Sequence, residues 1–240
     1  MEIVRESFLK YPHVFFYLYY DLLYHRNEID YFIKKGDGVL SGFVLVYKRP
    51  AHCPAVHVVG VVDGLPIPRF PCMRVHFEAS GVADDFLEGL VGSAKRAELS
   101  LLMYCGGWCR EIAARYAQSR AVRRLAEEDY EDYVKLVGLS LSREEYMESA
   151  RYGAYIGDEL VSVASAYRLP EIWIIHSVYT KPEYRGRGFG IAVTAKATYD
   201  ALEVEGRAAA LSVFENNTPA VKMYRKLGYK AIRTFLYLEI

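Results

Sequence analysis

Apolar and polar positions in the C-terminal half of the chain predict strands that alternate with helices. Residues 172–180 (IWIIHSVYT) and 208–214 (AAALSVF) are apolar runs of strand length, and an amphipathic segment continues from the first to about Glu205. A second helix is expected from about Thr218, because a proline in the first turn costs no hydrogen bond. Gly228 ends that helix, and residues 229–240 follow as one long strand or two short ones.

A glycine-rich turn, residues 185–190 (RGRGFG), joins the first strand to its helix. Glycines let the backbone approach a ligand, and the first N–H groups of a helix have no partner inside it, so the turn suits a diphosphate. It is not a P-loop, because no Lys-Ser/Thr pair follows Gly190. Ile191 and Val193 stand where a dinucleotide fingerprint needs its third glycine. A purely structural turn is the alternative for this segment alone.

A second motif lies on the following helix. Asn217, Ala220 and Tyr224 are spaced so that they share one helix face. Together the two motifs read R-x-x-G-x-G and N-x-x-A-x-x-x-Y-x-x-x-G-Y, and residues 181–184 (KPEY) precede the first. This pair resembles the GNAT superfamily of acyl-CoA-dependent N-acyltransferases. The close match covers residues 172–229, and a looser one begins near Arg123.

The resemblance implies an α/β (α+β) fold with a mixed, mostly antiparallel central sheet flanked by helices, and acetyl-CoA as co-substrate. In this family the fourth strand splays from the fifth, and the pantetheine arm enters the gap like an extra strand. The residues that the resemblance places at the cofactor are Val178, Tyr179, Thr180, Arg185, Gly186, Arg187, Gly188, Phe189, Gly190, Asn217 and Tyr224.

Two catalytic residues are expected. Tyr224 matches the family's general acid, and its phenol, with an ordinary pKa of about 10, can protonate the departing thiolate. The base is less well indicated, because no carboxylate shares the strand face of Ile174 and Val178. His176 is on that face, and an imidazole can take a proton at neutral pH, directly or through water. The competing interpretation is a half-buried histidine that is hydrogen-bonded inside the sheet, with Glu171 as the reserve base.

The two halves of the chain share a pattern. Residues 36–41 (GDGVLS) and 157–162 (GDELVS) each precede an apolar run and then a strand that carries a histidine, His57 or His176. This pattern predicts two tandem GNAT-like domains, a degenerate one over residues 1–119 and a catalytic one over 120–240. Pro66 and Pro68 replace the glycine turn in the first half and cannot present amides to a phosphate. Chance similarity of two hairpins is the alternative.

Composition narrows the partners. Lys plus Arg and Asp plus Glu number 30 each, so neither nucleic acid nor an anionic membrane is an expected partner. The cluster Arg120, Arg123 and Arg124 is interpreted as a solvated linker. No apolar run is long enough to cross a bilayer and no signal peptide is evident, so a cytoplasmic monomer or homodimer is expected. Residues 11–24 are rich in aromatic side chains and predict a buried helix or a dimer face.

The four cysteines, at positions 53, 72, 105 and 109, have no zinc-site spacing, so no metal is expected. Free buried thiols are the default in a cytosolic protein. One glutamine and three asparagines in 240 residues fit a hyperthermophilic source, in which a disulfide becomes admissible.

The predicted function is the transfer of an acetyl group from acetyl-CoA to a small-molecule amine or a peptide N-terminus. A catalytically silent acyl-CoA-binding sensor or scaffold is the alternative. An unrelated α/β binding module is a third reading, and the paired motifs argue against it. The sequence indicates neither the acceptor nor the acyl length.

Overall fold

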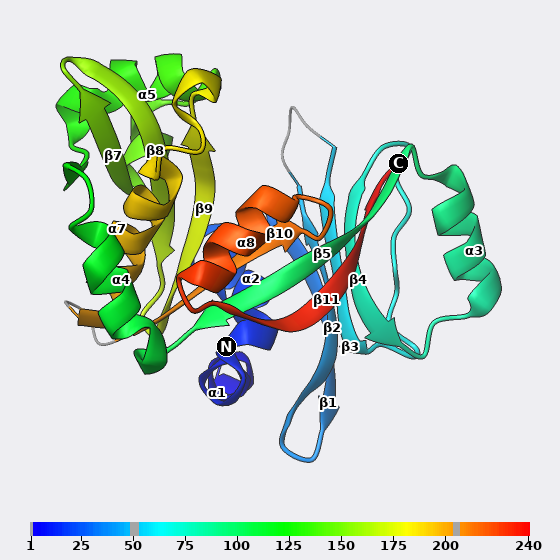
Figure 1. The fold of residues 1–240 in the computed structure, drawn as a ribbon. Coiled ribbons are helices and arrows are strands. Elements are labelled where there is room, and N and C mark those ends of the chain that lie inside the picture. The colour runs from blue at the N-terminus through cyan, green and yellow to red at the C-terminus, as the bar shows by residue number, and fades with distance from the viewer. Residues whose placement is uncertain (1, 49–52, 204–206) are drawn as a thin grey trace. The chain divides into compact units, whose positions relative to one another are not determined.

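The computed structural model describes residues 2–48, 53–203 and 207–240, and the chain forms two compact units (Figure 1). The first unit comprises Met1–Leu102, Phe214–Asn216 and Arg233–Ile240. The second comprises Met103–Val213 and Asn217–Ile232. Strands β5 (Arg96–Cys105) and β11 (Lys230–Glu239) therefore contribute residues to both units.

The first unit is a sheet with helices. Its elements are α1 (Glu2–Lys10), α2 (Pro12–Tyr24), β1 (Ile29–Gly36), β2 (Val39–Tyr47), β3 (Ala55–Val61), β4 (Arg74–Ser80), α3 (Asp84–Ser93), most of β5 and the end of β11. The strand order is β1-β2-β3-β4-β11-β5. The pairs β1–β2, β2–β3 and β4–β11 are antiparallel, and β3–β4 is parallel.

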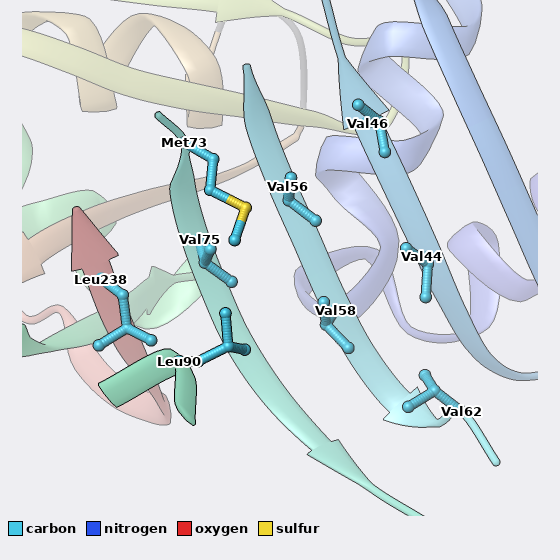
Figure 2. Packing of buried hydrophobic residues seen from close by; sticks show 9 residues of the cluster. All are labelled: Val44, Val46, Val56, Val58, Val62, Met73, Val75, Leu90 and Leu238. Atoms are coloured by element: carbon cyan, nitrogen blue, oxygen red, sulfur yellow. The ribbon is translucent and has the colours of Figure 1, made fainter. Parts of the chain in front are cut away.

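Alternation along β2 explains why helices cover both faces of this sheet. Val44 and Val46 are buried on one face in a cluster that includes Leu90 of α3 (Figure 2). The other members of that cluster are Val56, Val58, Val62, Met73, Val75 and Leu238. Phe43 is buried on the opposite face, where its ring centroid lies 5.9 Å from that of Phe15 in α2.

The second unit carries both predicted motifs. Its elements are the end of β5, the short 3₁₀ turn η1 (Gly107–Cys109), α4 (Arg110–Ala117), β6 (Val122–Arg124), η2 (Glu127–Asp129), α5 (Tyr130–Val137), α6 (Arg143–Met147), β7 (Ala150–Ile156), β8 (Glu159–Arg168), β9 (Ile172–Thr180), η3 (Pro182–Tyr184), α7 (Phe189–Glu203), β10 (Ala208–Phe214 less its last residue), α8 (Thr218–Lys226) and the start of β11.

The strand order in the second unit includes the run β10-β9-β8-β7-β6, in which β9–β10 is parallel and the other three pairs are antiparallel. Neighbouring residues of β8 point to different layers, as the strand period requires. Val163 packs with Tyr133 of α5, whereas Ala164 packs with Val193 of α7. The expected mixed, mostly antiparallel sheet flanked by helices is confirmed.

The elements predicted from the patterns of residues 172–240 are confirmed, and residues 230–239 form one long strand. The predicted helix end near Glu205 lies outside the described residues. Helix α2 accounts for the aromatic run of residues 11–24, in which buried residues include Phe15, Leu18 and Leu22.

Both units use the same sequence of strand directions. An antiparallel hairpin with a Gly-Asp or Asp-Gly turn leads into a third antiparallel strand, and a fourth strand pairs with the third in parallel. The hairpin register shifts between Lys34 and Lys35 in the first unit and between Ala154 and Tyr155 in the second, 120 positions later. The division at residue 119 remains a prediction, because residues 103–119 belong to the second unit and residues 233–240 to the first.

Candidate active site

The turn between β9 and α7 has the backbone that the glycines predicted. Gly186 and Gly188 have φ angles of +72° and +88°, values that disfavour side chains. A Cβ atom at Gly190 would lie 3.1 Å from Thr180 Oγ1 and 3.4 Å from Met223 Sδ. Helix α7 begins at Phe189, so its first-turn amides lie within this turn. A helix N-terminus of this kind can bind an anion, and the diphosphate site stays a prediction.

The strand that leads into the turn is irregular. Val163 pairs with Tyr179 and Ser165 pairs with His176, so one residue of β8 faces two residues of β9, Ser177 and Val178. Ser177 has a φ of +49°, which is unusual for a residue with a side chain. This bulge turns the main chain of β9 just before the three strand-end residues predicted to meet the cofactor, Val178, Tyr179 and Thr180.

Strands β9 and β10 pair over only part of their length. The register joins Ile172 to Ala208 and Ile174 to Ala210, and across the described residues it goes no further. Both strands continue beyond this point, β9 to Thr180 and β10 to Phe214. The edge of β9 that faces β10 is therefore free of strand pairing from Ile175 onwards, and this stretch contains the bulge.

Helix α8 places the second motif as its spacing predicted. Asn217 is the N-cap, and its Oδ1 accepts a hydrogen bond of 3.4 Å from the Ala220 amide. Tyr224 lies two turns later and is 7% exposed. Burial raises the pKa of Tyr224 to about 12. The phenol is therefore fully protonated at neutral pH.

Comparison with family models matches residues 115–229 to the acetyltransferase (GNAT) family. Residues 115–229 belong to the GNAT family. The matched segment contains the glycine turn, the β9–β10 gap and the helix that carries Tyr224. The resemblance inferred from the two motifs is confirmed, and acyl transfer is the general chemistry of the domain.

Related proteins agree with this assignment. Over 126 residues the chain is 28% identical to thialysine N-epsilon-acetyltransferase from Sus scrofa, an alignment that covers 45% of this chain and 74% of that protein. The structure of a GCN5-related N-acetyltransferase from Kribbella flavida is similar with a TM-score of 0.62 and 15% identity, over 91% of this chain and 92% of that one. At this identity the likeness shows the fold.

A tandem GNAT protein from the clavulanic acid biosynthesis pathway, solved without acetyl-CoA, is similar with a TM-score of 0.58 and 12% identity. The similarity covers 88% of this chain and 82% of that chain. A fold with two GNAT-like parts, as predicted from the internal pattern, therefore has a solved counterpart.

His176 in the GNAT domain is held by three neighbours. Its Nε2 lies 3.1 Å from Ser149 Oγ and its Nδ1 lies 3.0 Å from Ser177 Oγ. Its ring stacks on Tyr167 at a centroid distance of 4.0 Å. Burial first, and then the positive charge of Arg151, lower the pKa of His176 to about 3. This environment matches the competing interpretation, a histidine hydrogen-bonded in the sheet, more closely than it matches a direct base.

The reserve base, Glu171, immediately precedes β9. Its Oε2 is buried and has no hydrogen-bond partner among the described residues. Across the described residues, no group of three or more His, Cys, Asp or Glu side chains could hold a metal ion. In the same part of the chain, no helix is both long enough and apolar enough to cross a bilayer.

A buried arginine lies beside the histidine and was not singled out in the sequence. Arg151 of β7 is 4% exposed and sits between the rings of Tyr133 and Tyr146, 4.6 and 4.8 Å from their centroids. It donates to Ser165 Oγ and to the Glu145 carbonyl at 3.0 and 3.1 Å. Its positive charge adds to the effect of burial, and together they lower the pKa of His176 and keep the imidazole neutral.

The expectation of free thiols is wrong. All four cysteines are paired, Cys53 with Cys72 in the first unit and Cys105 with Cys109 in the GNAT-side unit. The sequence shows each spacing but not the approach of the two side chains, which depends on how β5 turns into η1.

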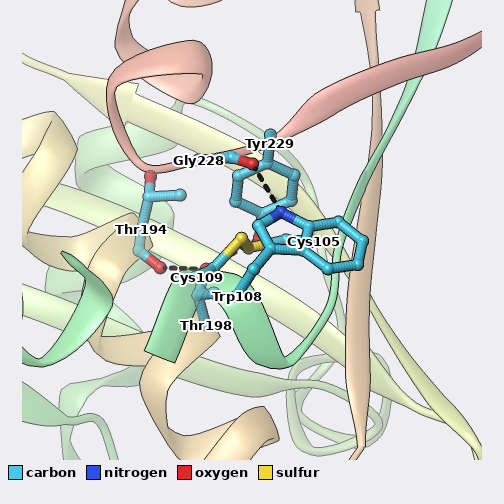
Figure 3. The surroundings of a disulfide bond; sticks show 7 residues. All are labelled: Cys105, Trp108, Cys109, Thr194, Thr198, Gly228 and Tyr229. Atoms are coloured by element: carbon cyan, nitrogen blue, oxygen red, sulfur yellow. Dashed lines mark hydrogen bonds between the residues drawn. A yellow bond between two sulfur atoms is a disulfide. The ribbon is translucent and has the colours of Figure 1, made fainter. Parts of the chain in front are cut away.

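The second disulfide packs at the end of the helix that carries Tyr224 (Figure 3). Trp108 Nε1 donates to the Gly228 carbonyl at 3.0 Å. Gly228 has a φ of +94°, and a Cβ atom there would lie 3.1 Å from Cys109 Sγ. The next residue, Tyr229, shares a hydrogen bond of 2.7 Å with Thr198 Oγ1 of α7. The disulfide thus helps to fix the corner between α8 and β11.

Proposed function

We propose that this chain transfers an acetyl group from acetyl-CoA to a primary amine by direct attack. The observation that carries the proposal is the gap between β9 and β10, which opens toward the glycine turn of residues 185–190. The free edge of β9 offers main-chain groups to the pantetheine arm, and the turn offers amides to the diphosphate. Val178, Tyr179 and Thr180 border the gap, and Asn217 caps the facing helix.

The reaction needs a neutral amine, an acceptor for the charge on the carbonyl oxygen, and a proton for the sulfur. The amine nitrogen forms a bond to the thioester carbon, the carbon–sulfur bond breaks, and the amine proton and the thiol proton are exchanged with the protein or water. A main-chain N–H of β9 at the bulge is the proposed donor that stabilises the developing oxyanion. No metal is needed for these steps.

Tyr224 is the proposed acid. The pKa of its phenol, about 12, is well above the thiol pKa of about 8.5, so complete proton transfer to the sulfur is uphill. We therefore assign it a hydrogen bond that strengthens as charge builds on the sulfur. The phenol keeps its own proton, and the thiolate is protonated by the proton that the amine loses or by water.

His176 is the proposed base only through water. Taking up a proton at pH 7 on a group of pKa about 3 costs roughly 5 kcal/mol, at 1.36 kcal/mol for each pKa unit. Both ring nitrogens are hydrogen-bonded to serine hydroxyls, so the imidazole orients a water through Ser149 or Ser177 and does not store the proton itself. An amine that arrives partly deprotonated then needs little help from the protein.

The low pKa of His176 also supports the second candidate function, a silent acyl-CoA-binding sensor or scaffold. That protein would keep the cofactor site and lack turnover. Titration calorimetry with acetyl-CoA, followed by a thiol-release assay over a panel of amines, separates the two. Binding together with amine-dependent thiol release supports the enzyme; binding without release over the whole panel supports the sensor. Absence of binding contradicts both.

The acceptor panel follows from the proposed chemistry and the named relative. The relative from Sus scrofa is named for a side-chain amine, so thialysine and lysine belong in the panel with polyamines and peptide N-termini. We propose that residues 141–152 line the acceptor side, because Ser149 and Arg151 in this segment approach His176. We also propose that the protein is a cytoplasmic monomer or homodimer. Its balanced charge is the reason for proposing that it binds neither nucleic acid nor membrane.

A further inference from the structure

Positive charge gathers around the glycine turn. Arg185 and Arg187 belong to the turn, and Arg120, which lies 65 positions before Arg185, reaches it from the chain that precedes β6. The N-terminus of α7 adds the positive end of a helix dipole. None of these three arginines forms an ion pair with a carboxylate of a described residue, although the structure contains such pairs elsewhere, for example Lys196 with Asp200. An anion would offset this like-charge repulsion.

Arg120 is held against the turn by its own contacts. Its Nη2 donates to the Arg187 carbonyl at 2.8 Å, and its guanidinium carbon lies 5.1 Å from the centre of the Phe189 ring. Its Nε is 4.0 Å from the position that a Cβ atom on Gly188 would take. One of five N–H donors is used in this way, so the exposed guanidinium keeps donors for a ligand beside the turn.

We propose that Arg120 binds a phosphate group of the acyl carrier and so extends the anion site beyond the glycine turn. This inference rests on the proposed function. A guanidinium is suited to the task, because it offers paired donors to phosphate oxygens and stays charged at any working pH. Coenzyme A carries two sources of this chemistry, the diphosphate and the 3′-phosphate. The sequence alone had placed Arg120 in a solvated linker with Arg123 and Arg124.

The neighbouring arginines explain why only Arg120 is assigned this role. Arg123 is committed to a bidentate ion pair with Asp129, with hydrogen bonds of 2.5 and 2.6 Å. Arg124 is exposed on β6, and among the described residues neither a hydrogen bond nor an ion pair joins its side chain to the turn. Arg124→Gln therefore removes the same charge from the same short segment and serves as the matched control for Arg120→Gln.

The experiment measures the affinity of the full chain, by titration calorimetry, for coenzyme A, 3′-dephospho-coenzyme A and acetyl-pantetheine. Arg120→Gln is expected to weaken coenzyme A binding at least tenfold, in line with the loss of a charged hydrogen bond, whereas Arg124→Gln stays within about twofold of the wild type. A loss that disappears with 3′-dephospho-coenzyme A assigns the 3′-phosphate. A loss that persists assigns the diphosphate. Either result supports the proposal.

Three results would overturn it. Wild-type affinity of the Arg120→Gln variant for coenzyme A contradicts phosphate binding, and so does an equal loss for Arg124→Gln. An equal loss for acetyl-pantetheine, which has no phosphate, would mean that Arg120 only supports the loop. Thermal melting of both variants checks that the fold is intact. Failure of the wild type to bind any of the ligands would instead remove the proposed function itself.

Discussion

The two units contain the same four-strand succession, yet only one of them opens. Strands β3 and β4 of the first unit pair without interruption from Ala55 with Arg74 to Val61 with Ser80. Strands β9 and β10 of the second unit pair only from Ile172 to Ile174 within the described residues. A parallel strand pair that stays closed along its length leaves no edge for a ligand, whereas the parted pair does.

The connection between the third and fourth strands accounts for the difference. In the first unit residues 62–73, all of them described, contain no helix, and three prolines interrupt them. In the second unit the connection contains the glycine turn and α7. A long helix inserted between parallel strands brings its N-terminus to the strand end, where a ligand can meet it. We infer that the first unit retains the sheet without the cofactor site.

The largest expected effect comes from closing the turn. Gly188→Val should abolish acetyl-CoA binding, with an affinity loss of at least a hundredfold, because φ is +88° and a side chain would occupy the face that meets the phosphates. Titration calorimetry measures the loss. Gly64→Val is the control, since Gly64 follows β3, has a φ of +78° and has nothing within 4 Å of its Cβ position. Similar losses in both variants would erase the distinction between the units.

Removal of the proposed acid ranks next. Tyr224→Phe should lower kcat by about 10²-fold, the lower end of the range for general acid catalysis, and leave the Kd for acetyl-CoA within threefold. Steady-state kinetics and calorimetry give the two numbers. Tyr116→Phe, in α4, removes a hydroxyl from the same unit and should change neither. Unaltered kcat in Tyr224→Phe would reduce Tyr224 to a packing residue.

The two disulfides offer a comparison between the units at smaller scale. The double substitution of Cys105 and Cys109 by Ser should lower kcat by roughly three- to tenfold, because Cys109 packs against Gly228 at the end of α8 and a misplaced catalytic helix loses alignment. The double substitution of Cys53 and Cys72 by Ser should cost stability but leave kcat per folded molecule unchanged. Equal effects on kcat would show that the corner does not position the helix.

The smallest effect on turnover is expected at His176. His176→Gln should change kcat by less than about threefold, because the imidazole does not hold the proton, and the pH profile of kcat/KM should show no inflection near 6.5 that this substitution removes. A tenfold loss of kcat in His176→Gln, together with a wild-type inflection near pH 6.5 that this variant lacks, would restore His176 as a direct base.

The same residue should affect stability in acid. Its folded pKa of about 3 lies below the ordinary 6.5, so the unfolded chain binds the proton first and stability falls as pH drops from 6.5 toward 3. Between pH 7 and 4.5 one such histidine costs up to about 2.7 kcal/mol. Urea unfolding at both pH values should show a smaller decrease in His176→Gln than in the wild type, and an equal decrease would contradict the lowered pKa.

The features that could be predicted from the sequence depend on residues that are close together along the chain. The apolar run of β9, the positive-φ glycines of the turn and the spacing of Asn217 and Tyr224 each act over a few residues, so the motif elements and the family could be inferred. The parting of β9 and β10 was available only through the family resemblance, since pairing joins segments 36 positions apart.

Contacts between residues far apart along the chain could not be predicted from the sequence. Arg120 contacts a carbonyl 67 positions away, and no motif marks it. The positive φ of Ser177 depends on the register between β8 and β9, and the environment of His176 depends on Arg151 from another strand. The pairing of the cysteines likewise required the shape of the chain around η1.

Hydrogen–deuterium exchange with and without acetyl-CoA tests the central claim most directly, because it reports on both units in one sample. We predict that the cofactor slows exchange of amides within residues 175–192, at the free edge of β9 and the glycine turn, and leaves residues 55–64 of the first unit unchanged. Saturating acetyl-CoA that left residues 175–192 unprotected, or protected residues 55–64 instead, would contradict the account.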